Sequence, residues 1–176
     1  MPFALTLRLD PDAANRIAAL WEALATAGLD SDRAALGYPA HLTLAIYPDD
    51  APPDALAAAL AALAPAWRSL PLPLAGLGLF PMPSPILWVA PAPSRALLAQ
   101  QAALLAALPA VEPDPHYRVD VWVPHITVSG PLTDPAAALR RVLPLWQPLT
   151  AMPNRAELVR FRPVQVLHGV DLAPGW

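Results

Sequence analysis

The stretch Val123-Pro124-His125-Ile126-Thr127-Val128 repeats, with small changes, an earlier stretch of the chain, Tyr38-Pro39-Ala40-His41-Leu42-Thr43-Leu44. Each stretch carries a histidine and a threonine two positions apart, separated and followed by aliphatic residues. Successive side chains of a β-strand point to opposite faces, so His41 and Thr43 should share one face, as should His125 and Thr127, while the aliphatic residues enter the core. The histidines are 84 positions apart, about half of the 176-residue chain. The two stretches therefore predict one site built from two copies of a repeated unit.

The order of predicted elements is the same in both halves of the chain. Alternating and helical spacing of apolar residues predicts strands and helices in turn. In the first half these are a strand over 3–9, a helix between Asp10 and Gly28, a strand over 41–47 and a helix over 55–66. In the second half they are a strand over 86–90, a helix over 94–108, a strand over 119–129 and a helix over 135–146.

Further elements lie outside this repeat. A strand over 70–80 is interrupted by Gly76 and Gly78, which indicates a bulge or a close backbone approach. A proline-rich turn is expected over 81–85, and one or two closing strands over 157–172. We therefore predict an α+β fold, bilobal and pseudo-twofold, in which a strand-helix-strand-helix unit is duplicated and two mostly antiparallel sheets flank a central cleft. The whole chain, 1–176, is expected to form one domain of two interleaved lobes.

Composition narrows the range of partners. Hydrophobic residues make up 56% of the chain and charged residues 14%, which indicates a folded protein. A net charge of −3 gives no general attraction for a long or duplex nucleic acid, although a small anion or an RNA end stays compatible. The chain has no cysteine, which excludes disulfides, thiolate metal sites and a cysteine nucleophile. No apolar run reaches membrane-span length, and we expect a cytoplasmic monomer.

Two histidines in one cleft suit phosphodiester chemistry. Displacing an alkoxide at phosphorus needs one group that removes a proton from the nucleophile and another that protonates the leaving oxygen. Two imidazoles that titrate near neutral pH can do both without a metal or cofactor. The hydroxyls of Thr43 and Thr127 are then expected to bind the non-bridging phosphate oxygens. The sequence predicts His41 and His125 as the acid–base pair.

The two phrases, Pro-x-His41-Leu-Thr43-Leu and Pro-His125-Ile-Thr127-Val, resemble the paired HxTx motifs of the two-histidine phosphoesterase superfamily, in particular its bacterial 2′-5′ RNA ligase-like, cyclic phosphodiesterase branch. The opening strand and the stretches 76–81 and 122–124 are similar to that branch as well. The resemblance implies a bilobal α+β fold and metal-independent hydrolysis of 2′,3′-cyclic phosphates at nucleotides or RNA ends, with 2′-5′ ligation in some members. It also implies catalytic roles for His41 and His125, with His125 as the base and His41 as the acid, and phosphate binding by Thr43 and Thr127.

Other side chains are weaker candidates for substrate binding. Arg8 with Thr6, Arg118 and Arg160 are candidates for the border of the cleft or for neutralising phosphate, against an equal expectation that they are solvated edge residues. The aromatic residues Phe80, Trp88 and Trp122 are candidates for stacking a base, although core packing is the more frequent role of such residues. Tyr47 and His116 are comparable candidates, and His168 is expected to be structural.

Two other functions fit the same residues. The first is a metal-dependent hydrolase in which the two histidines and a carboxylate such as Asp120 bind Zn²⁺ or Fe²⁺, although the sequence lacks the usual ligand spacings and the threonines would be unexplained. The second is a module that binds nucleotides or RNA ends without turnover. A nucleotide with a cyclic phosphate, or a short RNA end, is the partner expected in either non-metal case.

Overall fold

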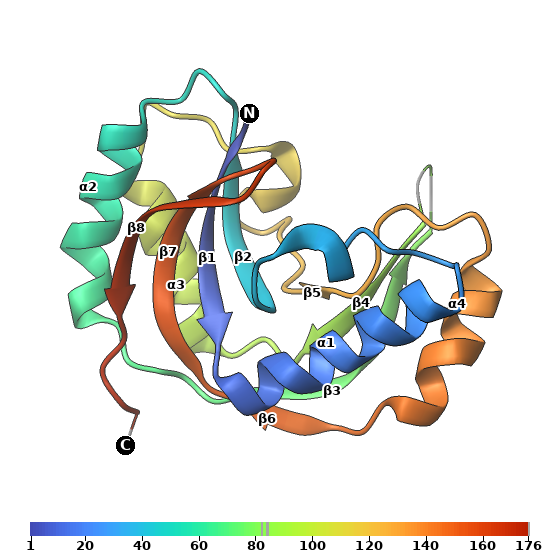
Figure 1. Cartoon of the computed structure of the whole chain (residues 1–176). Coiled ribbons are helices and arrows are strands. Elements are labelled where there is room, and N and C mark those ends of the chain that lie inside the picture. The colour runs from blue at the N-terminus through green and yellow to red at the C-terminus, as the bar shows by residue number, and fades with distance from the viewer. Residues whose placement is uncertain (82, 84, 176) are drawn as a thin grey trace.

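Two four-stranded sheets organise the computed structural model, which describes residues 1–81, 83 and 85–175 (Figure 1). The first sheet has the order β2 (His41–Tyr47), β1 (Phe3–Leu9), β7 (Pro153–Arg160) and β8 (Gln165–Asp171). The second sheet has the order β5 (Ile126–Thr127), β4 (Ile86–Pro91), β3 (Leu72–Phe80) and β6 (Leu149–Ala151). Neighbouring strands within each sheet are antiparallel. The predicted α+β class with two antiparallel sheets is confirmed.

The two sheets have equivalent strand orders. Strand β1 pairs with β2 on one side and β7 on the other, and β4 pairs with β5 and β3 in the same way. The strands that carry the two His-x-Thr phrases therefore occupy matching edge positions, and these edges contact each other across the molecule. This arrangement is the predicted pseudo-twofold repeat.

The helices are exchanged between the sheets. Helices α1 (Pro11–Thr26) and α4 (Pro135–Val142) pack together beside the second sheet, α1 against β6 and α4 against β4. Helices α2 (Pro53–Leu63) and α3 (Arg95–Ala106) pack beside the first sheet (Figure 1). Each helix that directly follows the first strand of a repeat thus packs on the sheet of the other repeat. Each lobe consequently contains elements from both halves of the chain.

Local signals in the sequence explain where the helices begin. The carboxylate of Asp10 accepts a 3.0 Å hydrogen bond from the Ala13 amide, and Ser94 and Asp134 cap α3 and α4 in the same manner. Asp10 also accepts a 2.6 Å hydrogen bond from the amide of Met152, the residue directly before β7. The cap therefore joins the end of β1 to β7 as well as starting α1.

Strand β1 is more deeply buried than its alternation predicts. The apolar face is buried as expected, and Thr6 on the opposite face is also buried. The strand lies inside its sheet and packs on both faces, and the Thr6 hydroxyl lies 2.9 Å from the Tyr38 hydroxyl. The alternation of Phe3 to Leu9, which is typical of a strand buried on one face only, therefore gives a wrong expectation for the burial of β1.

The strand predicted over 119–129 is also wrong, because only Ile126–Thr127 is extended in a ladder. Asp120 has a left-handed backbone (φ 67°), and the amide of Trp122 donates to the carbonyl of Arg118 at 3.0 Å, which turns the chain. Burial in this loop is consequently the reverse of what a strand with its valines in the core would show: Trp122 is buried while Val121 is 57% exposed. The valines of this loop border a groove and a cavity instead of entering the core.

The glycine signals in β3 are confirmed. The register between β3 and β4 shifts between Leu74 and Gly76, and a Cβ atom at Gly78 would overlap the indole of Trp88.

Within the turn predicted over 81–85, Met82 and Ser84 lie outside the described residues. Strand β6 is an additional element without a sequence prediction. None of the described helices is both long enough and apolar enough to cross a membrane.

Candidate active site

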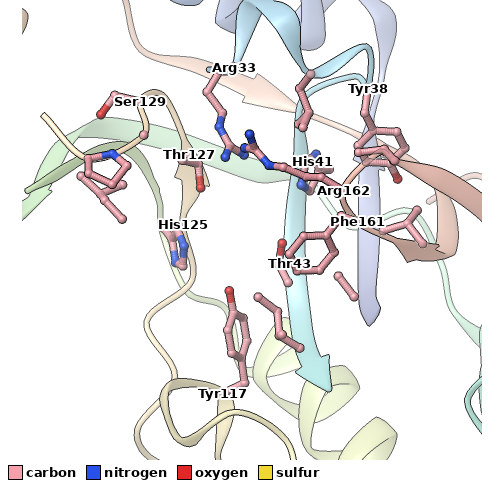
Figure 2. Close-up of a pocket in the computed structure, with 18 residues that line it drawn as sticks. Arg33, Tyr38, His41, Thr43, Tyr117, His125, Thr127, Ser129, Phe161 and Arg162 are labelled. Atoms are coloured by element: carbon pink, nitrogen blue, oxygen red, sulfur yellow. The ribbon is translucent and has the colours of Figure 1, made fainter. Parts of the chain in front are cut away.

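The two His-x-Thr strands border one cavity of about 260 Å³ between the sheets. His41 and Thr43 line it from β2, and His125 and Thr127 line it from the β5 region. Figure 2 shows the two pairs on opposite sides of this cavity. Residues far apart in the chain thus present two imidazoles and two hydroxyls to the same space.

Alternation along each strand produces this arrangement. Leu42, Leu44, Ile126 and Val128 are fully buried, whereas the histidines and threonines between them are only partly buried. Because neighbouring side chains of a strand point to opposite faces, anchoring the aliphatic residues in the core directs the polar ones into the cavity. The packing of ordinary core residues therefore positions the four polar side chains.

Both imidazoles make the same hydrogen bond. Nδ1 of His41 lies 2.8 Å from the carbonyl oxygen of Pro39, and Nδ1 of His125 lies 2.8 Å from that of Val123. A carbonyl oxygen can only accept, so Nδ1 carries the hydrogen in each ring. In a neutral imidazole this leaves the lone pair on Nε2. Both rings are thus prepared in the tautomer whose Nε2 accepts a proton.

Burial favours the neutral form of both histidines. It lowers the pKa of His41 to about 4, opposed by the hydrogen bond to Pro39 and assisted by the positive charge of Arg33. Burial also lowers the pKa of His125, and the hydrogen bond to Val123 opposes this effect. At neutral pH the cavity therefore holds two uncharged imidazoles.

A buried carboxylate lies behind His41. The rings of Tyr38 and His41 are 4.8 Å apart, and the Tyr38 hydroxyl donates a 2.6 Å hydrogen bond to Oε2 of Glu157. Glu157 also accepts hydrogen bonds from Arg155 at 3.0 Å and Arg8 at 3.4 Å through Oε1. His41 thus packs on a ring that is fixed by a charged network.

His125 has an aromatic environment instead. Its ring lies 5.1 Å from that of Phe80 and 6.1 Å from that of Trp88, and these two rings stack at 5.0 Å. A second cavity of about 490 Å³ adjoins this side and shares His125 and Tyr117 with the first. Its other lining residues include Phe80, His116, Val121 and Val123.

Several cavity residues lack a sequence prediction. Tyr38 and Tyr117 line the first cavity, and burial raises the pKa of Tyr117 to about 12, so its hydroxyl keeps its proton and can donate. Arg33 and Arg162 line it as well, and both contact Asp32. Tyr38 belongs to the phrase that contains His41, which is a usable signal, whereas the loop arginines have no distinctive pattern.

The weaker candidates are dispersed. Phe80 and Trp88 contact His125, and His116 lines the second cavity, as described above. The others lie away from both cavities. Arg8 contacts Glu157, Arg118 contacts Glu112 at 3.4 Å, Arg160 lies over the Phe3 ring, Trp122 borders a groove beside α3, Tyr47 borders a pocket near Pro2, and His168 lies on β8.

Asp120, the carboxylate considered for a metal site, borders the groove that contains Trp122. Among the described residues, no group of three or more histidine, aspartate or glutamate side chains is arranged to hold a metal.

Comparison with known proteins identifies similar chains. The family model described as the 2′-5′ RNA ligase superfamily matches residues 8–164. TT0787 of Thermus thermophilus has a similar structure, with a TM-score of 0.66, 20% identity and full coverage of both chains. Escherichia coli LigT complexed with 3′-AMP gives a TM-score of 0.59 at 16% identity, covering 97% of this chain and 96% of LigT. Kluyveromyces marxianus Usb1 gives a TM-score of 0.51 at 16% identity, covering 98% of this chain and 97% of Usb1. A comparison with curated protein sequences gives no significant match.

Proposed function

The chain belongs to the 2′-5′ RNA ligase superfamily, a group of phosphoesterase-type enzymes, and we propose that it is a metal-independent cyclic phosphodiesterase that opens the 2′,3′-cyclic phosphates of nucleotides or RNA ends. The observation that carries the proposal is the pair of histidines, His41 and His125, which line one cavity with identical Nδ1 hydrogen bonds. Two such rings supply a base and an acid on opposite sides of a phosphorus atom.

The reaction needs one neutral and one protonated imidazole. The neutral ring accepts a proton from water at Nε2 as the water oxygen bonds to phosphorus. The protonated ring gives its proton to the ribose oxygen as the bond from that oxygen to phosphorus breaks, and a 2′- or 3′-phosphate results. In the ligation direction the roles reverse. A bound phosphate anion raises the pKa of a nearby histidine, which supplies the protonated partner.

The environments of the two rings favour His41 as the neutral base. The positive charge of Arg33 adds to burial in lowering the pKa of His41, whereas no comparable charge acts on His125 among the described residues. The resemblance to the family implies the opposite assignment. Both assignments stay proposals, and the pH dependence of each histidine variant separates them.

Hydroxyl groups complete the phosphate site. Thr43 and Thr127 line the same cavity as the histidines, from opposite strands. Each hydroxyl can donate one hydrogen bond to a non-bridging oxygen, where charge accumulates in the transition state. We propose phosphate binding by both residues.

The nucleoside is proposed to occupy the second cavity. This cavity adjoins His125 and presents Phe80 together with Val121 and Val123, a mostly apolar surface on which a base can stack. LigT in complex with 3′-AMP shows that a protein with this fold binds a nucleotide. The proposed occupant of these two adjoining cavities is a mononucleotide or a short RNA end.

The deciding experiment is turnover of 2′,3′-cyclic mononucleotides by the purified protein, with and without EDTA, with the products separated by chromatography. We expect turnover that EDTA leaves unchanged. Turnover lost with the chelator would instead support the metal-dependent hydrolase. Saturable binding without any turnover would support the binding module.

A further inference from the structure

The charges that line the first cavity are all positive. Arg33 and Arg162 are the charged residues among its described lining, and no carboxylate contributes to it. The histidines on either side are held neutral by burial. A phosphate anion that enters a partly buried site loses hydration, and this loss must be offset by opposite charge and hydrogen bonds. The two arginines are the groups that can offset it.

Asp32 contacts both arginines, but with a different geometry for each. Arg162 directs Nη1 and Nη2 to the two oxygens of the Asp32 carboxylate, Nη2 at 2.6 Å, so its fork is occupied. Arg33 contacts Oδ2 alone, through Nε at 2.9 Å and Nη2 at 2.6 Å. For Nη1 of Arg33, no partner is found within the described ranges. Asp32 and the two guanidinium groups together carry a charge of +1, and the Asp30 carboxylate of the same loop acts on Arg162, whereas the donors of Nη1 on Arg33 stay free in the described part of the chain.

The loop that carries Arg33 is fixed across the cleft. It follows α1, and Asp30 in the same loop accepts a 3.1 Å hydrogen bond from the amide of Gly130, three residues after Thr127. Arg162 reaches Asp32 from the turn between β7 and β8. Figure 2 shows the Arg33 side chain extending into the space between Thr127 and His41. Its side chain therefore lines the cavity that is proposed to bind the phosphate.

We propose that Arg33 is the phosphate-binding cation of this cavity and that the Asp32–Arg162 ion pair positions it. The inference rests on the proposed function for its catalytic consequence, although anion binding itself does not require turnover. Arg33 presents a planar fork to the non-bridging oxygens and compensates the charge that two neutral imidazoles cannot. The lowered pKa of His41 agrees with a cation at this place.

The test is binding of inorganic phosphate by calorimetry to the wild-type protein, Arg33→Gln, Arg33→Lys and the control Arg140→Gln. Arg140 is an exposed arginine of α4 outside the lining of both cavities. We expect Arg33→Gln to weaken phosphate binding at least about tenfold, Arg33→Lys to bind with intermediate affinity, and Arg140→Gln to bind like the wild type. Phosphate affinity that Arg33→Gln leaves unchanged would overturn the inference.

Kinetics on a cyclic nucleotide separate this inference from the proposed function. If the wild type turns over substrate, Arg33→Gln should lower kcat by about 10²-fold, as loss of one transition-state donor does, with partial rescue in Arg33→Lys. Turnover unaffected by Arg33→Gln would overturn the inference and leave the proposed function intact. If the wild type shows no turnover but binds phosphate in a manner that depends on Arg33, the proposed function is overturned and the inference about Arg33 is supported. Thermal unfolding of each variant monitors folding, and NMR titration of the wild-type Arg33 side chain with phosphate replaces any variant that does not fold.

Discussion

The Tyr38 hydroxyl donates a 2.6 Å hydrogen bond to Oε2 of Glu157, a carboxylate that is only 2% exposed. Through the contact between its ring and that of His41, Tyr38 connects a buried charge to the cavity. Burial and the nearby carboxylate raise the pKa of Tyr38, so the hydroxyl keeps its proton and stays a donor. Tyr38 therefore packs against the His41 ring within the first cavity and is itself held in place by Glu157.

Tyr38→Phe should therefore destabilise the protein and lower turnover while the ring packing is kept. Removing a donor to a buried carboxylate costs about 1–3 kcal/mol of unfolding free energy, to be measured by urea denaturation. Tyr47→Phe is the matched control, because the buried Tyr47 hydroxyl has no hydrogen-bond partner among the described residues, and we expect no loss of stability. Equal destabilisation by the two substitutions would show that the Glu157 contact contributes nothing specific.

His41→Ala and His125→Ala should each nearly abolish turnover. Each substitution removes one proton-transfer group, and we expect kcat to fall by about 10²–10⁴-fold, measured with a 2′,3′-cyclic nucleotide. His168→Gln serves as the control, because His168 lies on β8 outside the lining of both cavities. Retention of most activity in either alanine variant would contradict the two-imidazole mechanism.

Thr43→Val and Thr127→Val test the proposed phosphate contacts. Valine has nearly the same shape as threonine but lacks the hydroxyl, so each change removes one donor with little effect on packing of the strand. We expect kcat to fall by about 10²-fold, more than KM rises, because the lost hydrogen bond is strongest in the transition state. The exposed Thr133 provides the control substitution Thr133→Val. A change confined to KM would reassign the hydroxyls to ground-state binding.

The sequence predicted the elements that depend on local patterns. The aliphatic residues around His41 and His125 have the alternation of strands, and the order of strands and helices repeats in the two halves, so the paired edges of the sheets followed from the duplication. The strand prediction over 119–124 is wrong because it also depended on a local pattern alone. The valines of this loop alternate as in a strand, but the left-handed backbone at Asp120 and the burial of Trp122 depend on tertiary packing that the pattern does not contain.

The charged part of the site could not be predicted in this way. Arg162 and Asp32 are 130 positions apart, and Tyr38 and Glu157 are 119 positions apart. Nothing in the local sequence distinguishes Arg33 from a solvated loop arginine, because its role depends on which residues the fold brings to Asp32. Similarly, Arg8 and Arg118 look equivalent to Arg33 in the sequence but contact carboxylates away from the cavity.

The pH dependence of kcat/KM should have its optimum below pH 6.5, the ordinary pKa of a histidine. One imidazole must be neutral and the other protonated, and in the free protein both pKa values are lowered, that of His41 to about 4. As pH rises above the higher of the two values the acid loses its proton, so kcat/KM falls on the alkaline side, and as pH falls below the lower value the base is lost. The kcat profile should lie at higher pH, because the bound phosphate raises both values, and Arg33→Gln should move the limb governed by His41 upward by removing a nearby positive charge. A kcat/KM optimum above pH 7, or a limb that Arg33→Gln leaves in place, would show that burial and Arg33 do not control the protonation of this pair.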